Sequence, residues 1–383
     1  MDHDFNACLN VEDLRVRARR RAHRMVFDYI DGGADRERAL HRNSEAFAEY
    51  ELHFRVLADV KTVDTATSVL GHKISLPFFT SPAAGNRLFH VTGERAVAKA
   101  VSDAGLIYCL STLSSVSIEE IARVASGPKW FQCYVWKDRG LVKEMLSRAR
   151  AAGFTALILT VDLPVHGNRL RDARNGFTVP PKIGMRQIWE AIKRPAWTWD
   201  YLMSAPIGYA NLAEKTAAVG LAQFVAEQLD AGFNWRDAEW LLAEWGGPSV
   251  IKGIVREDDA VRAVATGFDA VMLSNHGGRQ LDDSPAPINV LEKVVDALKG
   301  RAEVILDGGI RSGADVLKAL ALGARAVSFA RPYLYGLAAG GESGVRRALA
   351  IIAEAVRRDM ALLGVRSIAE IDRSFIRRGA YRQ

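Results

Sequence analysis

Cysteine is scarce in this 383-residue chain, and long uninterrupted apolar runs are absent. The three cysteines, Cys8, Cys109 and Cys133, form neither a CxxC pair nor a metal-ligand spacing, and two of them lie inside apolar stretches. We therefore interpret them as buried thiols in a reducing compartment, and we predict no metal site. No apolar run approaches the roughly 18 residues of a transmembrane helix, and no charged-then-apolar leader is present. This pattern predicts a cytoplasmic protein, or one that lies on the cytoplasmic face of a membrane.

The chain also has little net charge, which is +6 at pH 7. A dense basic run stands out near the N-terminus and consists of Arg15, Arg17, Arg19, Arg20, Arg21 and Arg24. These arginines are interspersed with apolar residues at helical spacing, which favours a solvated helix face over a membrane or nucleic-acid contact. We therefore predict no nucleic-acid partner. Apolar residues make up 49% of the chain, enough for a sizeable core.

Residues 1–73 are predicted to form an N-terminal helical region. Residues 11–32 have the periodicity of a single helix that ends at Gly32, with Met25, Val26, Tyr29 and Ile30 on one apolar face. Spacing alone favours Tyr29 as a core residue.

From residue 74 onward, short apolar strands alternate with helical segments. The eight predicted strands are residues 74–84, 106–112, 129–135, 156–162, 249–254, 270–277, 303–309 and 326–332. The predicted helices between them include residues 93–104, 141–152, 258–266 and 312–322, each followed by a glycine. This pattern predicts a parallel (β/α)8 TIM barrel over residues 74–363, within a single domain of residues 1–383.

Polar side chains gather at the carboxyl ends of the predicted strands, where such barrels carry their active sites. They are Ser111, Gln132, Tyr134, Thr160, Asp162, Lys252, Asp307 and Arg331. The sixth predicted strand begins the stretch AVMLSNHGGRQLDD, residues 270–283. This stretch carries His276 and Arg279 beside Gly277-Gly278. Alternation along a strand predicts that Ser274 and His276 point to the same side. A histidine can exchange a proton near neutral pH, and an arginine fits a carboxylate. Taken alone, however, this pair also suits an ordinary surface turn.

The stretch DGGIRSGADV, residues 307–316, is the clearest candidate phosphate site. Gly308 and Gly309 allow close backbone approach, Arg311 supplies charge, and Ser312 with Asp315 predicts a helix N-cap. Ala330 and Arg331 lie at the end of the eighth predicted strand and are expected to face the same place. No Rossmann fingerprint appears, which favours a mononucleotide. A flavin suits the neutral groups of Ser111, Gln132 and Thr160 and the cation of Lys252, although a Schiff-base lysine is an alternative.

The substrate side is predicted to contain Tyr29, Tyr134, Arg169, His276 and Arg279. Two arginines can hold a carboxylate and fix its orientation. Asp162 is expected to pair with His276 and raise its basicity, while a helix or turn cap is the alternative role.

A long insertion, residues 163–248, separates the fourth and fifth strands. Within it, residues 182–202 combine Arg186, Lys193 and Arg194 with Trp189, Trp197, Trp199 and Tyr201. This mixture suits a membrane interface, a subunit contact or a lid over the barrel.

Four motifs carry a resemblance to a known family: SNHGGRQLD, LDGGIRSGADVLKALALGA, FQCYVWKDR and GNRLRDARNGF. The chain closely resembles the FMN-dependent 2-hydroxy acid oxidases and dehydrogenases, which include glycolate oxidase, lactate oxidase, flavocytochrome b2 and membrane-linked lactate and mandelate dehydrogenases. The likeness extends from YIDGGADRE to the C-terminal helices. It implies FMN-dependent oxidation of an L-2-hydroxy acid to a 2-keto acid.

The resemblance also implies a role for each candidate residue. His276 matches the catalytic base, Asp162 its partner, Arg169 and Arg279 the carboxylate clamp, and Tyr29 and Tyr134 the substrate tyrosines. Lys252 matches the lysine beside the flavin ring. The implied ring and ribityl contacts are Ser111, Gln132, Thr160 and Ser274, with the backbone of Ala83 and Ala84 along the flavin. The implied ribityl and phosphate site is Asp307, Gly308, Gly309, Arg311, Ala330 and Arg331.

Departures from the family pattern bear on the substrate and the fit of the cofactor. Ala330 replaces the usual glycine, the PAAG stretch lacks the usual hydroxyl at its second position, and Leu113 stands where glycolate oxidase has tryptophan. His166 is expected near the substrate side chain.

The basic, tryptophan-rich insertion resembles the membrane-linked branch, which implies electron transfer to a quinone or another acceptor. A soluble oxidase that reduces O2 to H2O2 is the alternative. Relatives also imply a homotetramer.

Overall fold

The computed structural model of the chain describes residues 5–177, 184–212 and 227–379. Eight parallel strands form one sheet in the order β4-β11-β10-β9-β8-β7-β6-β5. Their bounds are β4 (Phe78–Thr80), β5 (Tyr108–Ser111), β6 (Lys129–Tyr134), β7 (Ala156–Thr160), β8 (Ser249–Ile254), β9 (Ala270–Leu273), β10 (Glu303–Asp307) and β11 (Ala326–Phe329). The outer strands β4 and β5 contact each other, so the sheet forms a nearly closed barrel. The predicted (β/α)8 fold is confirmed.

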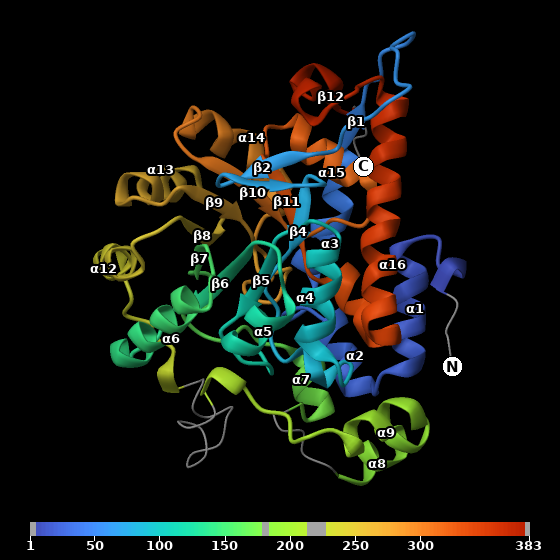
Figure 1. Cartoon of the computed structure of the whole chain (residues 1–383), viewed down its shortest axis with the longest axis vertical. Helices are drawn as coiled ribbons and strands as arrows, with labels where there is room; N and C mark the ends of the chain where they lie inside the picture. The colour runs from blue at the N-terminus through green and yellow to red at the C-terminus, as the bar shows by residue number, and fades with distance from the viewer. Residues whose placement is uncertain (1–4, 178–183, 213–226, 380–383) are drawn as a thin grey trace.

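Helices surround this barrel, as the strand-helix alternation predicts (Figure 1). They are α4 (Gly93–Asp103), α5 (Ile118–Val124), α6 (Arg139–Ala151), α12 (Trp235–Trp245), α13 (Glu257–Thr266), α14 (Pro287–Leu298), α15 (Gly313–Ala321) and α16 (Arg331–Leu363). The last of these is interrupted at Gly340 and Gly341, whose backbone angles are not helical. The strands are buried almost throughout because helices cover the outside and apolar side chains fill the inside.

A β-hairpin closes the amino-terminal end of the barrel. It consists of β2 (Thr67–Val69) and β3 (His72–Ile74), and its Val69 and Ile74 join the apolar cluster inside the barrel. The predicted first strand, residues 74–84, is therefore wrong in its bounds, because Ile74 belongs to this hairpin and only residues 78–80 pair in the barrel. The carboxyl end of the barrel is left for the polar side chains.

The described part of the N-terminal region, residues 5–73, contains three α-helices, α1 (Val11–Arg21), α2 (Arg24–Asp31) and α3 (Arg38–Glu45). The prediction of one continuous helix over residues 11–32 is wrong. Ala22 adopts an extended conformation, and the side chain of His23 accepts a hydrogen bond from Met25 N that starts a new helix. This break turns α2 and α3 toward the carboxyl end of the barrel, while α1 packs along α16.

Short elements complete the described chain. The strand β1 (Tyr50–Leu52) pairs antiparallel with β12 (Ile376–Arg378). The 3-10 helices are η1 (Phe5–Ala7), η2 (Ala46–Glu49), η3 (Asn86–Leu88), η4 (Ala210–Leu212), η5 (Ile368–Glu370) and η6 (Arg373–Phe375).

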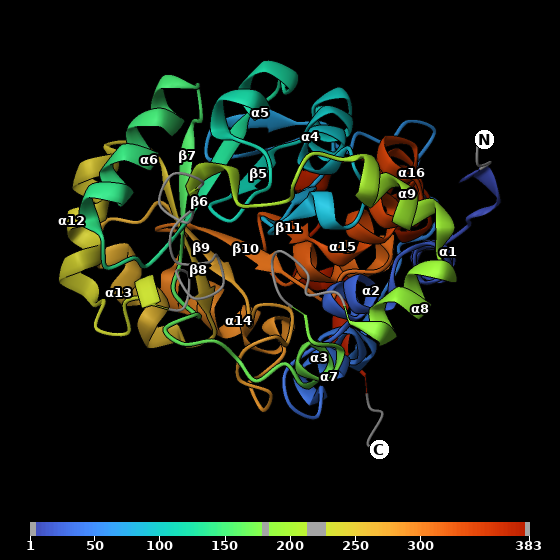
Figure 2. The same cartoon turned by 90° about the horizontal axis from the view of Figure 1, so that it is seen from below.

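The last part of the predicted insertion, residues 163–248, contributes α12 to the helices around the barrel, while its first part forms helices beside the barrel. These helices are α7 (Leu170–Asn175), α8 (Met185–Ile192) and α9 (Pro195–Met203). Figure 2 shows α8 and α9 packed together, beside α1 and α2 and away from α6 and α12. Residues 182 and 183 of the predicted basic and aromatic segment lie outside the described residues. In the part of the chain that the structure describes, no helix has the length and apolarity needed to span a membrane.

Candidate active site

A cavity of about 440 Å³ lies at the carboxyl end of the barrel. It brings together most of the residues that the sequence singles out: Tyr29, Ala83, Ala84, Gln132, Tyr134, Thr160, Arg169, Lys252, His276, Arg279, Asp307, Gly308, Gly309, Arg311, Ala330 and Arg331. These residues come from the N-terminal helix α2, from the carboxyl ends of seven strands and the loops that follow them, and from the insertion. One cavity therefore gathers the proposed base, both arginines and the glycine-rich loop.

Ser111, Ser274 and Asp162 do not line the cavity but hydrogen-bond to residues that do. Ser111 Oγ donates to Gln132 Oε1 at 3.1 Å, and Gln132 Nε2 donates to Thr160 Oγ1 at 3.1 Å. Ser274 Oγ accepts from Lys252 Nζ at 2.9 Å and donates to Asp307 Oδ2 at 2.8 Å. Both serines therefore orient groups of the cavity wall.

His276 lies in a tight turn beyond the end of β9. The strand stops at Leu273, so the alternation used to place Ser274 and His276 on one side does not apply. His276 has a φ of 58°, a left-handed conformation that is uncommon for a residue other than glycine. Its backbone N–H donates to Ser274 Oγ at 3.0 Å. The imidazole position is therefore set by the turn and not by the strand.

The imidazole of His276 is paired with the carboxylate of Asp162. The distance from His276 Nδ1 to Asp162 Oδ1 is 2.8 Å, and because an ionised carboxylate only accepts, Nδ1 carries the proton. In the neutral ring, Nε2 then has a lone pair for a substrate proton. Burial lowers the pKa of His276 below its ordinary value, although Asp162 opposes this shift. The predicted pairing is thus present, while burial outweighs the predicted gain in basicity.

Asp162 occupies space provided by an irregularity in β8. Gly253 has a φ of 110°, and the pairing register between β8 and β9 shifts there. A Cβ atom at this position would lie 2.7 Å from Asp162 Cβ. Burial acts to raise the pKa of Asp162, but the charges of His276 and Lys252 outweigh it and keep that pKa below its ordinary value. The carboxylate therefore stays ionised beside the histidine.

Two arginines line the cavity near His276. The Arg279 guanidinium lies 4.6 Å from the centre of the Tyr29 ring, and its Nη1 donates to the carbonyls of Tyr29 and Gly32. Burial lowers the pKa of Arg279 to about 10, which still leaves it charged at neutral pH. Arg169 Nε donates to the carbonyl of Arg279 at 3.4 Å. The pair can therefore present two cations to one carboxylate.

Lys252 and Asp307 form a buried ion pair at the base of the cavity. The distance from Lys252 Nζ to Asp307 Oδ2 is 3.1 Å, and the side chains are only 5% and 7% exposed. Burial acts to lower the pKa of Lys252, but Asp307 and Asp162 outweigh it and raise that pKa. A Schiff-base lysine must lose its proton to react, so this environment disfavours the alternative role.

The glycine-rich loop after β10 has the geometry of an anion site. Gly308 and Gly309 have φ values of 95° and 82°, and Ser312 and Asp315 form the predicted capping box of α15. A Cβ atom on Gly308 would meet nothing within 4 Å, so this part of the loop is open to a ligand. Ala330 has a φ of −111°, which any residue adopts, so its methyl group causes no backbone strain.

Arg331 is more constrained than the sequence suggests. Its guanidinium donates to the carbonyls of Ile30, Gly277 and Gly32 at 3.0, 2.9 and 2.9 Å. By contrast, within the described ranges the Arg311 guanidinium has one hydrogen bond, from Nη1 to the carbonyl of Ile310 at 2.7 Å. Both arginines line the cavity, but Arg331 also ties the end of α2 to the histidine turn.

The residues present fit an FMN cofactor. One part of the cavity combines open glycine backbone with Arg311 and Arg331, as a phosphate requires. Another part combines the amide of Gln132, the hydroxyl of Thr160 and the cation of Lys252, which suit a flavin ring.

Sequence reasoning missed several residues of the cavity wall, namely Ser81, Phe89, Leu163, Asp172, Phe177, Tyr209 and Leu334. Phe177 stacks on Tyr29 with ring centres 4.4 Å apart, so Tyr29 is part of an aromatic wall and not only of the core. Tyr209 belongs to the insertion, where no periodic pattern indicates its direction. Only the GNRLRDARNGF motif, which ends at Phe177, gave a signal for any of them.

Comparison with known proteins gives one consistent family. The sequence profile described as FMN-dependent dehydrogenase matches residues 18–378. A protein named putative L-lactate dehydrogenase from Mycobacterium tuberculosis is 43% identical over 368 residues, which covers 96% of this chain and 88% of the relative. An L-lactate oxidase from Nostoc is 41% identical over 372 residues, or 96% of this chain and 98% of the relative.

Solved structures agree with the sequence relatives. The monotopic membrane protein (S)-mandelate dehydrogenase superposes with a TM-score of 0.93 at 36% identity, covering 97% of this chain and 99% of that protein. A mandelate oxidase structure superposes with a TM-score of 0.80 at 39% identity, covering 94% of this chain and 96% of that protein. The similarity therefore includes both dehydrogenases and oxidases.

Proposed function

The chain belongs to the FMN-dependent dehydrogenase family, and from this we propose that it oxidises an L-2-hydroxy acid with a lactate-like or mandelate-like side chain to the 2-keto acid. Family membership already makes it an FMN-dependent 2-hydroxy acid dehydrogenase or oxidase. The observation that carries the proposal is the His276–Asp162 pair in the same cavity as Arg169 and Arg279.

Each group has a defined task in this proposal. Arg169 and Arg279 bind the substrate carboxylate, which fixes the hydroxyl-bearing carbon relative to the histidine. His276 Nε2 accepts a substrate proton, and Asp162 stabilises the imidazolium that results. FMN, when bound, would accept the two electrons together with the second proton that the substrate loses. Tyr29 and Tyr134 contact the substrate.

The residues proposed to hold FMN divide between its ring and its phosphate. Gln132, Thr160, Lys252 and the backbone of Ala83 and Ala84 would hold the ring. Asp307, Gly308, Gly309, Arg311, Ala330 and Arg331 would hold the ribityl chain and the phosphate. Ser111 and Ser274 would act through Gln132 and Lys252, to which they are hydrogen-bonded.

An anaerobic substrate panel tests the proposed reaction. Purified holoenzyme is mixed without oxygen with L-lactate, (S)-mandelate, glycolate and longer 2-hydroxy acids, and the loss of flavin absorbance is followed. We expect bleaching by lactate or mandelate and none by the corresponding acids that lack the hydroxyl group. A flavin that no 2-hydroxy acid bleaches would contradict the proposal.

The electron acceptor is proposed to be a quinone or a similar acceptor. The apolar, basic surface of α8 and α9 and the similarity to a monotopic membrane protein support this choice. A soluble oxidase is the second candidate, favoured by the similarity to L-lactate oxidase. Dye reduction and hydrogen peroxide formation are measured side by side. Peroxide formed as fast as substrate disappears would support the oxidase instead.

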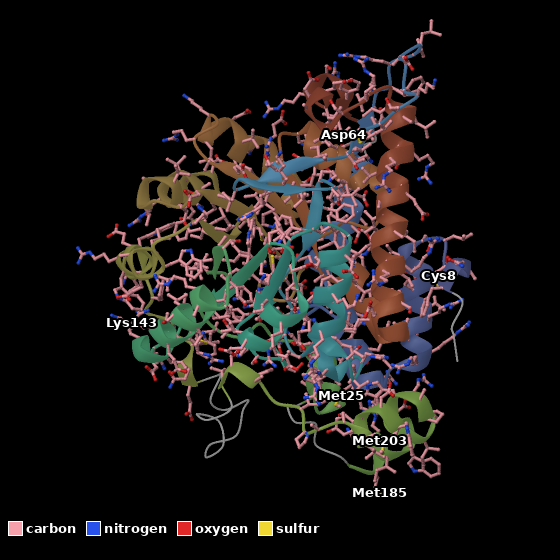
Figure 3. The ribbon with its side chains drawn as sticks, viewed as in Figure 1. Cys8, Met25, Asp64, Lys143, Met185 and Met203 are labelled. Carbon is pink, nitrogen blue, oxygen red and sulfur yellow. The ribbon has the colours of Figure 1, made fainter. Side chains whose placement is uncertain are left out.

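We also propose that α8 and α9 attach the enzyme to the cytoplasmic face of a membrane. Large apolar side chains are exposed on these two helices: Met185, Ile188, Trp189, Ile192, Trp199, Leu202 and Met203. Figure 3 shows Met185 and Met203 at one end of the molecule, away from the barrel. Arg186, Lys193 and Arg194 accompany them, and basic residues near an anionic surface each contribute about 1 kcal/mol to binding. A homotetramer stays a prediction.

Changing the apolar surface should release the enzyme from vesicles. Ile188, Trp189 and Ile192 are 45%, 61% and 63% exposed, so replacing all three with serine costs little packing but removes apolar area that a bilayer would bury. We expect binding to vesicles with anionic lipids, measured by cosedimentation, to fall at least tenfold. The matched control is Leu57→Ser, another exposed apolar residue, which lies outside these helices. Equal loss with the control would contradict the proposal.

Removing one arginine of the clamp should mainly weaken substrate binding. In Arg279→Met the carboxylate keeps Arg169 but loses its second cation, so we expect KM to rise about 10- to 100-fold and kcat to fall less. Steady-state kinetics with a dye acceptor measure both constants. Because Arg279 also donates hydrogen bonds to the carbonyls of Tyr29 and Gly32, the thermal stability of the variant must be measured as well. An unchanged KM would contradict the assignment.

A further inference from the structure

Helix α3 lies between the two loops that carry the proposed chemistry. On one side, the backbone of Leu40 is so close to Gly278 that a Cβ atom there would lie 2.4 Å from Leu40 N. On the other side, a Cβ atom on Gly309 would lie 2.1 Å from the carbonyl oxygen of Asn43. The histidine turn and the glycine-rich loop therefore both pack directly against this helix.

A reciprocal pair of buried amides connects α3 to the histidine turn. Asn43 Nδ2 donates to Asn275 Oδ1 at 2.7 Å, and Asn275 Nδ2 donates to Asn43 Oδ1 at 2.7 Å. The two residues are only 2% and 5% exposed. Since a buried amide loses its hydrogen bonds to water, each side chain depends on the other for satisfaction.

The orientation of the Asn275 amide is fixed by its other partners. Its Oδ1 also accepts from Gly278 N at 3.0 Å, and its Nδ2 also donates to the carbonyl of Pro285 at 3.0 Å. A backbone N–H can only donate and a carbonyl can only accept, so the amide has one possible arrangement. Asn43 must then present a donor and an acceptor on two separate atoms, which its amide does and a single hydroxyl group does not.

The turn between these contacts is conformationally costly. His276, Gly277 and Gly278 have φ values of 58°, 66° and 73°, so three consecutive residues are left-handed. For His276 this conformation costs roughly 1 kcal/mol or more and persists only where neighbouring contacts impose it. Asn275 is the residue immediately before this turn, and its Oδ1 holds the far end at Gly278.

A second contact fixes the other end of α3. Asp282, which is 6% exposed, accepts from the backbone N–H groups of Ala39 and Arg36, both at 3.0 Å. A carboxylate at a helix N-terminus satisfies free N–H groups and interacts favourably with the helix dipole. The segment from Asn275 to Asp282, which contains His276, is thus attached to both ends of the helix.

From these contacts we infer that Asn43 is a positioning residue: through its amide pair with Asn275 it holds the left-handed turn that aims His276 into the cavity. The inference rests on the proposed role of His276 as the base. Asn43 does not line the cavity, so it acts on proton transfer only through the turn. Because misplacement of a reacting group by about 1 Å can cost on the order of 100-fold in rate, a small shift of this turn is sufficient.

The test is a double-mutant cycle between Asn43→Ala and His276→Ala. Flavin reduction is measured anaerobically in the holoenzyme with L-lactate or (S)-mandelate, whichever bleaches the wild-type flavin faster. We expect Asn43→Ala to lower the maximal rate of reduction at least tenfold, with less than threefold change in KM and in FMN affinity. In the His276→Ala background the same change should have less than a twofold effect.

The matched control is Asn289→Ala. Asn289 donates to Glu49 at 3.4 Å, so it contacts the segment that follows α3 without touching the histidine turn. We expect less than a twofold change in its rate. If Asn43→Ala does not fold, the same double-mutant cycle is carried out with Asn43→Ser, because the serine hydroxyl retains one hydrogen-bond donor.

Two results would overturn the inference while leaving the base in place: an equal loss from Asn43→Ala in both backgrounds, or a loss confined to FMN affinity. By contrast, if the flavin of His276→Ala is reduced at the wild-type rate, the proposed function itself is wrong. Failure of the inference and failure of the proposed function therefore give different results.

Discussion

His276→Ala should lower the rate constant of flavin reduction about 10³-fold while the protein stays yellow. A positioned general base contributes on the order of 10²- to 10⁴-fold, and the expected loss of about 10³-fold lies in the middle of that range. FMN should remain bound because the residues proposed to hold it are separate from His276. Stopped-flow absorbance under anaerobic conditions measures the rate, and the flavin-to-protein ratio measures occupancy.

Added imidazole is the control for this variant. If the missing ring is the cause of the loss, imidazole in solution should restore part of the rate by entering the space that the side chain leaves. A variant that is reduced at the wild-type rate, or one that loses flavin in proportion to activity, would refute the assignment of His276 as the base.

In the proposed mechanism, Asp162 sets the pH range in which His276 can act as the base. The active form has a neutral imidazole, so the rate falls as pH drops through the pKa of His276. Burial lowers that pKa and Asp162 raises it, so removing the carboxylate charge must lower it further. In Asp162→Asn the acidic limb of the profile for flavin reduction should therefore move to lower pH, alongside a loss of rate from the poorly held ring.

The barrel and the composition of its site were predictable from sequence because both depend on local patterns. Apolar runs of four to eight residues marked the strands, and side chains such as Lys252 and Asp307 followed or ended those runs. Since carboxyl ends of barrel strands meet at one rim, their proximity follows from the fold alone. The observed cavity agrees with this expectation for most of the predicted residues.

Contacts between distant segments were not predictable in the same way. The Asn43–Asn275 pair joins residues 232 positions apart, and no local pattern relates two asparagines at that separation. Likewise, the three carbonyls that hold Arg331 belong to Ile30 of α2, to its C-cap residue Gly32 and to Gly277 of the histidine turn. The break at Ala22 was missed because the apolar periodicity continues across it, while His23 caps a new helix.

Lys252→Met should destabilise the protein by roughly 3 to 5 kcal/mol, because removing one partner of a buried ion pair leaves the other charge buried and unpaired. Asp307 would keep hydrogen bonds from Ser81, Ser274 and Ser328 but lose the only cation that contacts it among the described residues. FMN affinity should fall as well, since Lys252 lines the cavity. Urea unfolding with excess FMN measures the stability, and fluorescence titration measures the affinity.

The pH dependence of that loss can be derived from the buried carboxylate. In the wild type, burial acts to raise the pKa of Asp307, but Lys252 and the serines keep that pKa below its ordinary value. The ion pair therefore stabilises the fold at neutral pH, and this stabilisation is lost as the pH falls and Asp307 becomes protonated. Without the lysine, burial would raise the pKa of Asp307 above its unfolded value. The variant should then be least destabilised at acidic pH and lose more stability as pH rises.

The double variant Lys252→Met/Asp307→Asn separates the two effects. It removes both charges, so no buried ion is left without a partner, and much of the stability lost in Lys252→Met should return. FMN affinity should stay low in both variants, because neither has the Lys252 ammonium group that lines the cavity. A double variant no more stable than Lys252→Met would show that packing, and not the unpaired carboxylate, causes the loss. Wild-type affinity for FMN in either variant would remove Lys252 from the proposed cofactor site.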